Sequence, residues 1–389
     1  MNLTSFSFPT KMLYGAGALG GLRGILVHLG VKRPLVVTDG GFKATKGFAS
    51  LVAALGGEAD GKAPVGSGWA LHADVHANPA EADVRDAAES YVRNDCDGIV
   101  AIGGGSPMDA GKAARLLIKR PGFELARFYD EADWSDLAPL VAIPTTAGTG
   151  SEVGRSSVIT LESTKRKAVL FHPALLAVQV ILDPELTVGL PPKLTAATGA
   201  DALTHCIESF TCPVFHPMCD GIALEAIRLI ADALPRAYLN GSDIDARGRM
   251  LVAASMGGVA FQKDLGVVHS LAHPLSTLCG LHHGLANALC LVAGMRFCAA
   301  RRPGIYRRVG AALGLELGGT EDAEVDRATT AFLEGFLRGL GLGSRLSEHG
   351  VSMAQLDALA DQAFADPCHR SNVVPVSRDD LRGLYDDVI

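Results

Sequence analysis

Residues 98–114 read GIVAIGGGSPMDAGKAA: a short apolar run, three consecutive glycines and the start of a helical pattern. Gly98–Ile102 has the composition of a buried strand, and the segment from about Pro107 to Ile118 has the pattern of a helix. Glycines at such a turn let backbone N–H groups approach a phosphate closely, and the helix N-terminus adds partial positive charge. The stretch predicts a phosphate-binding turn. Its spacing matches neither GxGxxG nor GxxxxGK[ST], and a purely structural turn is an equal alternative.

The alternation of strand and helix extends over the first half of the chain. Pro34–Asp39 and Leu140–Ile143 read as buried strands, and residues 80–94 read as an amphipathic helix. Strands that alternate with helices in this way form a parallel sheet with helices on its faces. The Gly-rich residues 56–75 fit no element, so we expect a surface loop there.

From residue 191 onward the sequence is almost entirely helical in pattern. Helical stretches cover residues 193–210, 219–238 and 244–261, and strand-like alternation is nearly absent. At 389 residues the chain is longer than one hydrophobic core usually supports. We therefore predict an α/β domain over residues 1–186 and an all-α domain over residues 187–389, with the active site in the cleft between them.

Composition and charge indicate an ordinary cytoplasmic protein. Hydrophobic residues make up 48% of the chain, charged residues 20%, and the formal net charge is −7. Without a long cluster of Lys or Arg, nucleic acid and anionic membranes are not expected partners. The N-terminus lacks the features of a signal peptide, and no uninterrupted apolar run is long enough to span a membrane. Eight cysteines without a CxxC pair are expected to be reduced thiols.

Two other features favour a dinucleotide at the predicted sheet. Asp39 ends the first predicted strand, where a carboxylate can accept from ribose hydroxyls and would repel a 2′-phosphate, which favours NAD over NADP. In a purely structural interpretation, Asp39 is a turn residue ahead of two glycines. The segment PTTAGTGSE (144–152) follows the last predicted strand, and its small hydroxyl residues can hydrogen-bond a ligand at close range.

Two apolar segments concentrate residue types that bind metals. In TGADALTHCIE (198–208), Asp201 and His205 lie four residues apart, and therefore on one helix face. In GVVHSLAHPLSTLCGLHHG (266–284), four of the chain's twelve histidines fall within fifteen residues, namely His269, His273, His282 and His283. Each could be an ordinary core residue, but burying so many unpaired polar groups would be costly. We predict a divalent transition metal with nitrogen and oxygen ligands, although spacing alone does not select which four residues bind it.

These motifs together resemble the iron-containing (group III) alcohol dehydrogenase family over nearly the whole chain. The resemblance rests on the segments FPTKMLYGAGAL, VVTDGG, AIGGGSPMDAGKAA, IPTTAGTGSE, ILDPELTVGLPPKLTAATGADALTHCIESF and GVVHSLAHPLSTLCGLHHGLANAL. It implies a Rossmann-like N-terminal domain, a helical C-terminal domain, NAD(P), and one divalent metal, usually iron (Fe2+) and sometimes zinc (Zn2+). It also implies a homodimer or a higher homo-oligomer.

Carried over residue by residue, the resemblance assigns roles to individual positions. The implied metal ligands are Asp201, His205, His269 and His283, with His273 as a nearby active-site histidine and His282 as a bystander. The implied nucleotide-binding residues are Asp39, Gly104, Gly105, Ser106, Asp109, Thr145, Thr146, Thr149, Ser151 and Lys167. Two departures from the family pattern, Gly154-Arg155 after "GSE" and Asn372-Val373-Val374 in place of "NPR", leave the substrate open.

The expected activity is a metal-dependent, NAD-linked oxidoreductase. A metal held by one carboxylate and three imidazoles would act as a Lewis acid on the substrate oxygen, while hydride passes between the carbinol carbon and the nicotinamide. His273 is the candidate for relaying the hydroxyl proton to solvent. Residues 264–295 contain no Lys or Arg, which favours a small neutral primary alcohol and its aldehyde as the substrate pair.

Three alternatives stay open at this point. An oxoacid reductase similar to maleylacetate reductase, or a hydroxyacid dehydrogenase, is possible because Arg155 or Arg370 could bind a carboxylate. A lyase similar to dehydroquinate synthase shares this architecture, but its basic binding residues are not found around the metal segments. A ligand-binding protein without activity is the third alternative, which metal analysis and NAD titration would test.

Overall fold

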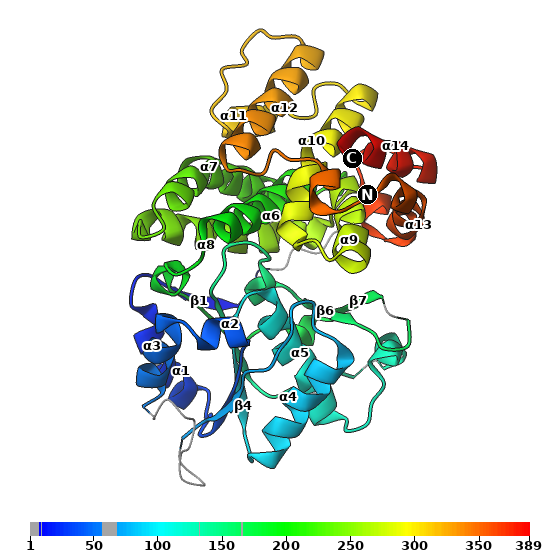
Figure 1. The fold of residues 1–389 in the computed structure, drawn as a ribbon. Helices are drawn as coiled ribbons and strands as arrows, with labels where there is room; N and C mark the ends of the chain where they lie inside the picture. The colour runs from blue at the N-terminus through cyan, green and yellow to red at the C-terminus, as the bar shows by residue number, and fades with distance from the viewer. Residues whose placement is uncertain (1–7, 9, 57–67, 132, 165) are drawn as a thin grey trace. The chain divides into compact units, whose positions relative to one another are not determined.

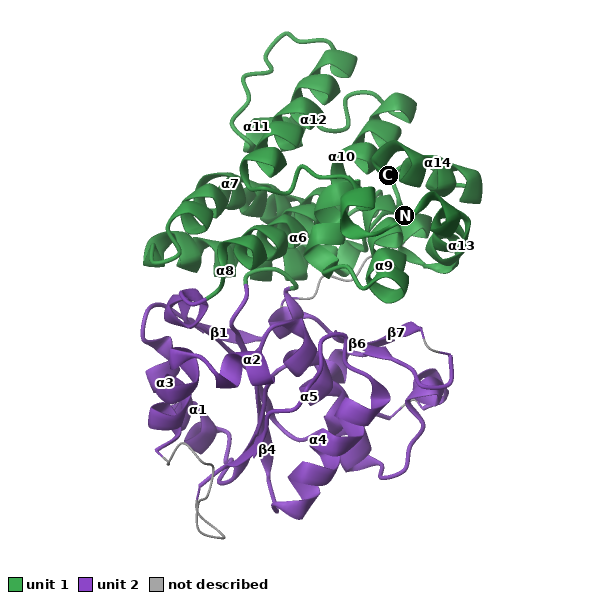
Figure 2. Ribbon diagram, in the orientation of Figure 1, with its two compact units in different colours: residues 1–7, 147–149, 190–389 green, residues 8–146, 150–189 purple. Residues whose placement is uncertain are grey.

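The structure is a computed structural model that describes residues 8, 10–56, 68–131, 133–164 and 166–389. The chain forms two compact units (Figure 2). The sheet unit comprises Phe8–Thr146 and Gly150–Gly189, and the helical unit comprises Leu190–Ile389 together with the segment Ala147–Thr149. The sequence-based boundary between residues 186 and 187 stays a prediction, and it did not anticipate that short segment.

Six parallel strands form the centre of the sheet unit (Figure 1). In spatial order they are β1 (Lys11–Tyr14), β8 (Gln179–Leu182), β5 (Leu140–Pro144), β4 (Gly98–Gly103), β2 (Pro34–Val37) and β3 (Ala70–His72). The chain passes outward from β2 to β3 and then crosses back to β4 on the other side of β2. The strand order therefore reverses between β2 and β4. Open parallel sheets bind their ligands at such a point, outside the carboxyl ends of the strands.

Helices cover both faces of this sheet, as the alternating sequence pattern predicts. They are α1 (Leu22–His28) and α3 (Lys46–Leu55) on one face, and α4 (Glu81–Arg93) and α5 (Gly105–Lys119) on the other (Figure 1). Ile102 packs in the same core cluster as residues of α1 and α3. Its neighbour Ala101 faces α5, where a Cβ on Gly111 would lie 3.0 Å from the Ala101 Cβ. Glycine at this position therefore lets α5 approach the sheet closely.

Two regions of the sheet unit differ from the sequence-based expectation. Residues 56–75, expected to form a surface loop, include β3, which pairs in parallel with β2 through Leu35 and Ala70. The expectation was wrong there because three residues are too few to show an alternating pattern; residues 57–67 lie outside the described part of the chain. The antiparallel hairpin of β6 (Ser156–Thr160) and β7 (Lys167–Phe171) was not predicted.

The helical unit confirms the predicted all-α character of the C-terminal half. Its α-helices are α6 (Pro192–Thr211), α7 (Pro217–Leu239), α8 (Ile244–Ala260), α9 (Val267–Cys279), α10 (His283–Arg301), α11 (Arg307–Ala312), α12 (Asp322–Gly339), α13 (Leu356–Ala365) and α14 (Arg378–Val388). Helix α6 is the central one, since it is buried from Thr195 to Ser209 and packs on α7, α8 and α10. Small residues make this possible: a Cβ on Gly199 would lie 2.3 Å from Leu234 of α7.

Helix α10 is long and apolar enough to cross a membrane by length and composition alone, and α8 and α9, with the short turn after α8, meet the same criteria as a bent pair. However, 56% of the apolar window of α10 is buried inside the helical unit, and core helices of compact proteins meet these criteria as well. All eight cysteines are free thiols, as predicted, and Cys279 is partly buried while the other seven are buried.

Candidate metal centre and nucleotide-binding edge

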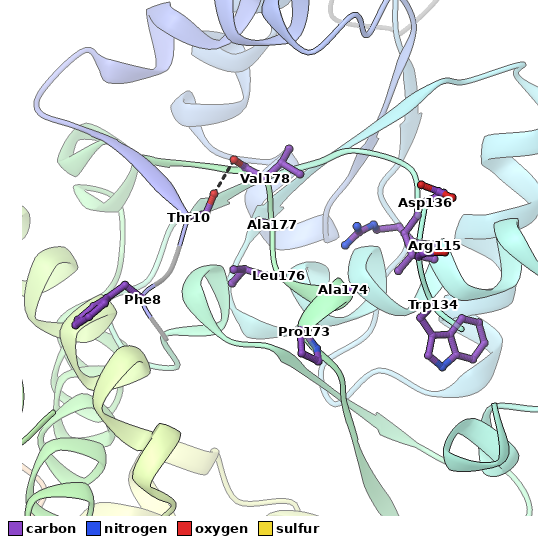
Figure 3. A pocket seen from close by; sticks show the side chains of 12 residues that line it. Phe8, Thr10, Arg115, Trp134, Asp136, Pro173, Ala174, Leu176, Ala177 and Val178 are labelled. Carbon is purple, nitrogen blue, oxygen red and sulfur yellow. Dashed lines mark hydrogen bonds between the residues drawn. The ribbon is translucent and has the colours of Figure 1, made fainter. Parts of the chain in front are cut away.

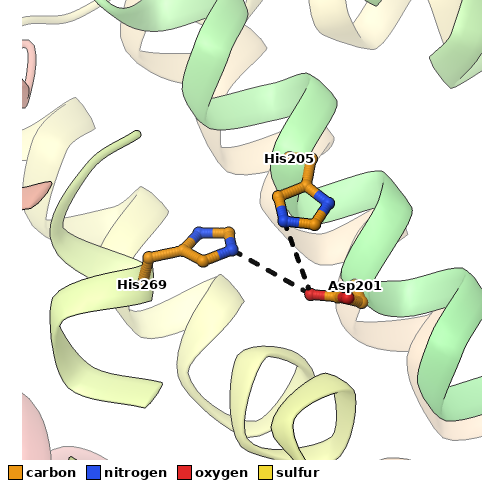
Figure 4. Close-up of side chains that lie close together, drawn as sticks. All are labelled: Asp201, His205 and His269. Atoms are coloured by element: carbon orange, nitrogen blue, oxygen red, sulfur yellow. Dashed lines mark ion pairs between the residues drawn. The ribbon is translucent and has the colours of Figure 1, made fainter. Parts of the chain in front are cut away.

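One carboxylate oxygen forms the centre of a cluster in the helical unit. Asp201 and His205 lie one turn apart on α6, and His269 of α9 faces them (Figure 4). Oδ1 of Asp201 lies 3.8 Å from Nε2 of His205 and 3.9 Å from Nε2 of His269. Nε2 of His283, the first residue of α10, lies 3.6 Å from the same oxygen. The structure thus brings together all four residues that the resemblance implies as metal ligands.

The imidazoles of this cluster lie against one another in a largely buried setting. The rings of His205 and His269 stack with centroids 4.7 Å apart, and those of His269 and His283 lie 5.5 Å apart. Only 1–6% of the side chains of Asp201, His205 and His269 is exposed, compared with 26% for His283. Burial lowers the pKa of His205 to about 4, so its ring is neutral at pH 7 and offers a lone pair. His282 is exposed.

Glu208 sets the orientation of the His269 ring. Its Oε2 lies 2.6 Å from Nδ1 of His269, and its Oε1 accepts from the backbone N–H of Val268 at 2.6 Å. Burial alone would lower the pKa of His269, but the hydrogen bond and charge of Glu208 outweigh it and raise this pKa. Because Nδ1 donates to Glu208, the lone pair of the neutral ring is on Nε2, the atom that faces Asp201.

Asn287 of α10 directs its side-chain amide into the cluster. Its Nδ2 lies 2.7 Å from Oδ1 of Asp201 and 3.3 Å from Nε2 of both His269 and His283. An amide nitrogen carries two hydrogens and cannot donate to all three atoms. One carboxylate with three imidazoles is a donor set that suits a divalent transition metal. The residues present therefore fit the predicted metal.

His273 lies beside this cluster but has a different partner. Its ring stacks on that of His283 with centroids 5.3 Å apart, while its Nδ1 lies 2.7 Å from Oδ2 of Asp366. Cys368 completes a second group with these two side chains. The resemblance implies that His273 is an active-site histidine separate from the ligands, and this role stays a prediction.

Asp39 and the glycine turn after β4 lie next to each other where the strand order reverses. Asp39 follows β2, and Gly103 ends β4 with a φ of 146°. A Cβ on Gly103 would lie 3.1 Å from Oδ2 of Asp39, so the two positions are adjacent. The other oxygen of Asp39 accepts from the N–H of Phe42 at 2.8 Å and caps the short helix α2 (Gly40–Lys43). Asp39 is thus a helix cap, with one oxygen directed to the glycine turn.

Helix α5 begins directly after this turn. Gly104 occupies its N-cap position, without a side-chain cap, and Gly105 and Ser106 are its first residues. The first N–H groups of a helix have no partner within the helix and attract anions. Thr145 donates its N–H to the carbonyl of Gly103 at 2.9 Å, and the Thr146 hydroxyl would lie 3.6 Å from a Cβ on Gly104. Thr145 and Thr146 therefore lie next to the glycine turn and the first turn of α5.

Asp109 and Ser151 are engaged with the protein itself. Asp109 accepts from the Ser151 hydroxyl at 2.6 Å and from the N–H of Val158 at 3.1 Å, which ties α5 to β6. Lys167 begins β7, opposite Thr160. Thr149 belongs to the segment 147–149 of the helical unit, where a Cβ on the preceding Gly148 would lie 2.9 Å from Thr198 of α6.

Lys112, a residue that sequence reasoning missed, holds the loop from Ser151 to Ser156 in place. It is fully buried, and its Nζ donates to Oγ of Ser151 at 3.0 Å and to the carbonyls of Gly154 and Ser156 at 3.1 and 2.9 Å. Glu208 and Asn287 were missed too, although helical spacing could have found both. Glu208 lies on the α6 face of Asp201 and His205, and Asn287 lies four residues after His283.

A separate pocket of the sheet unit lies at the amino ends of β5 and β8, the edge opposite to Asp39 (Figure 3). It encloses about 600 Å³ and is lined by Trp134, Leu137, Pro173 and Val178 among others. The buried Arg115 also lines it, but its guanidinium donates to the carbonyls of Ala138 and Leu175. None of the predicted site residues lines this pocket.

Comparisons with known proteins agree with this geometry. The family profile described as "Iron-containing alcohol dehydrogenase" matches residues 9–184, and "Fe-containing alcohol dehydrogenase family, C-terminal" matches residues 195–389. The chain is 39% identical to 4-hydroxybutyrate dehydrogenase of Cupriavidus necator over 95% of this chain and 96% of that protein. It is 34% identical to NAD-dependent methanol dehydrogenase of Bacillus methanolicus over 95% and 96%. A crystal structure of 1,3-propanediol oxidoreductase superimposes with a TM-score of 0.93, at 32% identity and full coverage of both chains. With both halves matched and the donor cluster assembled, the chain belongs to the iron-containing alcohol dehydrogenase family and is an oxidoreductase of the alcohol dehydrogenase type.

Proposed function

We propose that this protein interconverts a small primary alcohol and its aldehyde with NAD(H), using one divalent metal held by Asp201, His205, His269 and His283. Fe2+ is the expected ion and Zn2+ the alternative. The observation that carries the proposal is the convergence of the three imidazoles on one carboxylate oxygen of Asp201. The names of two relatives, an NAD-dependent methanol dehydrogenase and a 1,3-propanediol dehydrogenase, support the cofactor and the size of the substrate.

The chain's residues would divide the work as follows. Bound at the cluster, the cation supplies Lewis acidity toward a substrate oxygen, and the nicotinamide supplies the hydride acceptor. Asp39 would accept from the ribose hydroxyls, and the N–H groups at Gly104–Ser106 would hold the pyrophosphate. Thr145, Thr146, Thr149 and Lys167 would contact the nucleotide, whereas Asp109 and Ser151 would shape the loop around it.

His273 would take the hydroxyl proton and pass it to solvent. Its side chain is 24% exposed, and its ring lies against that of the proposed ligand His283. An imidazole is suited to this role because its ordinary pKa lies near neutrality.

A second candidate function is the oxidation of a hydroxyacid or the reverse reduction of an oxoacid. One specific observation favours it: the relative from Cupriavidus necator, at 39% identity, is named 4-hydroxybutyrate dehydrogenase. Against it, the metal segments 264–295 contain no Lys or Arg. Arg155 packs over the Phe171 ring at 5.6 Å, and Arg370 is exposed. The neutral alcohol is therefore the leading substrate class.

Matched four-carbon substrates separate these candidates. Protein loaded anaerobically with Fe2+ or Zn2+ is assayed at the NADH absorbance band with 1-butanol, 1,4-butanediol and 4-hydroxybutyrate. Higher kcat/KM for the alcohols supports the leading proposal, and a preference for the acid that falls on Arg155→Ala or Arg370→Ala supports the second candidate. The absence of NADH formation with every substrate would reject both. Light scattering on the same sample tests the homodimer or higher oligomer that the resemblance implies, and cell fractionation tests the proposed cytoplasmic location.

The metal assignment has its own test. His269→Ala is expected to lose both metal and activity, whereas His273→Ala is expected to keep the metal and lose rate. Metal content by mass spectrometry and turnover of the same preparations decide between these outcomes. Metal loss in both variants would refute the division of roles.

A further inference from the structure

The two histidines on successive turns of α9 are each held at Nδ1 by a carboxylate from another element. His269 pairs with Glu208 of α6 at 2.6 Å, and His273 pairs with Asp366, directly after α13, at 2.7 Å. An ionised carboxylate only accepts hydrogen bonds, so each ring must present an Nδ1–H. Both neutral rings consequently carry the lone pair on Nε2. In His269 this atom faces Asp201, and the same arrangement at Nδ1 is present in His273.

Asp366 is itself held by other groups of the helical unit. Its Oδ1 accepts from the hydroxyl of Ser270 and from the backbone N–H of Cys368, both at 2.9 Å, which leaves Oδ2 for His273. Burial would raise the pKa of Asp366, but the hydrogen bonds from His273 and Cys368 outweigh it and lower this pKa well below the usual range. A fixed, ionised carboxylate therefore holds His273 in one tautomer.

The other ring nitrogen of His273 remains available. Within the described part of the chain, Nε2 of His273 makes no hydrogen bond. The ring lies 5.3 Å from that of His283 and 5.9 Å from that of His269, measured between centroids. A proton-accepting nitrogen thus lies next to the proposed metal ligands, with its lone pair preserved by a partner on the opposite side of the ring.

We propose that Asp366 is a positioning residue for the dehydrogenase reaction: it holds His273 as the Nδ1–H tautomer, so that Nε2 takes the proton of the substrate hydroxyl. This inference rests on the proposed function of His273 and adds the residue through which the ring is oriented. Nδ1–H stays bonded to Asp366 throughout, while one proton moves from the hydroxyl oxygen to Nε2 and then to solvent.

A double-mutant cycle tests whether Asp366 acts through His273. Asp366→Asn removes the charge and can present N–H groups to the ring, which favours the other tautomer; kcat is expected to fall on the order of 100-fold with KM within about threefold. In the His273→Ala background, the same substitution is expected to change kcat less than about threefold. Asp361→Asn, an exposed residue of α13 that pairs with Arg378, is the matched control and should retain full activity.

Two outcomes of this cycle would overturn the proposal. One is an equal loss of kcat from Asp366→Asn with and without His273, which would show a general structural effect. The other is loss of metal from Asp366→Asn, measured by mass spectrometry, which would place its role in the metal site.

A spectroscopic measurement keeps the test independent of activity. In zinc-loaded protein labelled with 15N-histidine, the His273 signal is identified by its loss in His273→Ala, and two-bond 1H–15N couplings report the tautomer. We expect Nδ1–H in the wild type and a shift toward Nε2–H in Asp366→Asn. Nε2–H in the wild type would reject the proposal even if no alcohol were turned over, whereas Nδ1–H without turnover would reject only the proposed function.

Discussion

His269 of α9 donates through Nδ1 to Oε2 of Glu208 on α6 across 2.6 Å, and both side chains are buried. Glu208 accepts at the same time from the first turn of α9, through the N–H of Val268. One carboxylate therefore fixes both the backbone that presents His269 and the rotation of its ring. Glu208 lies on the α6 face that carries Asp201 and His205. Its bonds to α9 therefore hold His269 at a fixed position relative to these two residues.

Glu208→Gln is expected to weaken metal binding by roughly 10- to 100-fold, because partners of this kind orient the ligand and raise its basicity. Glutamine keeps the size of the side chain but loses the charge and one of the two acceptor oxygens. Competition with a chromophoric chelator measures the apparent Kd for Zn2+. Glu225→Gln, an exposed residue of α7 paired with Arg228, serves as the control and should leave the Kd unchanged. Equal affinity in Glu208→Gln and wild type would show that the hydrogen bond is irrelevant to the metal.

Gly284→Ala is expected to separate α10 from α6 at the metal cluster. A Cβ at this position would lie 2.1 Å from the carbonyl oxygen of Ala197 and 3.2 Å from the Cβ of Asp201, so α10 must move and carry His283 away from Asp201. Overpacking of this kind costs about 1–3 kcal/mol. We expect a lower Tm, by roughly 2–4 °C per kcal/mol for a unit of this size, together with weaker metal binding.

Gly335→Ala makes the same change at an exposed position, and we expect it to raise stability where Gly284→Ala lowers it. Gly335 is exposed on α12, and a Cβ added there would meet no heavy atom within 4 Å. Alanine should stabilise that helix by about 0.5–1 kcal/mol and leave the metal in place. A thermal melt and metal analysis of the two variants decide the matter; equal behaviour of both would contradict the close packing of α6 and α10.

Local sequence signals accounted for the elements that frame the candidate site. The sequence of β4 has the apolar composition of a buried strand, a glycine turn follows it, and the sequence of α5 has helical periodicity. The helices of the C-terminal half show clear periodicity too. Strands β1 and β6–β8 were missed although β2 and β5 are equally short, because each of the missed strands begins with a polar residue and none is buried throughout, as β2 and β5 are. The three-residue β3 lay inside a stretch taken as a loop because it is too short to show an alternating pattern.

Part of the candidate site follows from local sequence spacing, and part depends on contacts between residues far apart in the sequence. The stacking of Asp201, His205 and Glu208 follows from helical spacing within α6, and that of His283 and Asn287 follows from spacing within α10. The bond between His273 and Asp366 joins residues 93 positions apart and depends on how α13 returns to α9. No single-sequence pattern encodes that contact, because it results from tertiary packing.

Lys112→Met is expected to destabilise the loop that follows β5 and to weaken NAD binding. Burial lowers the pKa of Lys112, yet its Nζ bonds several oxygens between Ser151 and Ser156, and methionine would leave these acceptors without a donor. Each stranded buried acceptor costs about 1–3 kcal/mol. Thermal melts and the fluorescence-based Kd for NAD measure the two effects. Lys43→Met, at an exposed site of the same unit, should change neither, and unchanged values in Lys112→Met would show that Lys112 does not hold the loop.

Asp39→Asn is expected to shift the cofactor preference from NAD toward NADP. Asparagine can still accept from the N–H of Phe42 and cap α2, so the variant removes the charge while keeping the local fold. Repulsion between one carboxylate and a 2′-phosphate near a protein surface amounts to about 1–2 kcal/mol, or roughly tenfold in the ratio of kcat/KM for NAD to that for NADP. Steady-state kinetics with both cofactors measure this ratio. Asp39→Ala loses the cap as well as the charge, so a ratio that falls in the alanine variant but not in the asparagine variant would show that the shape of the α2 turn, rather than the charge of Asp39, selects the cofactor.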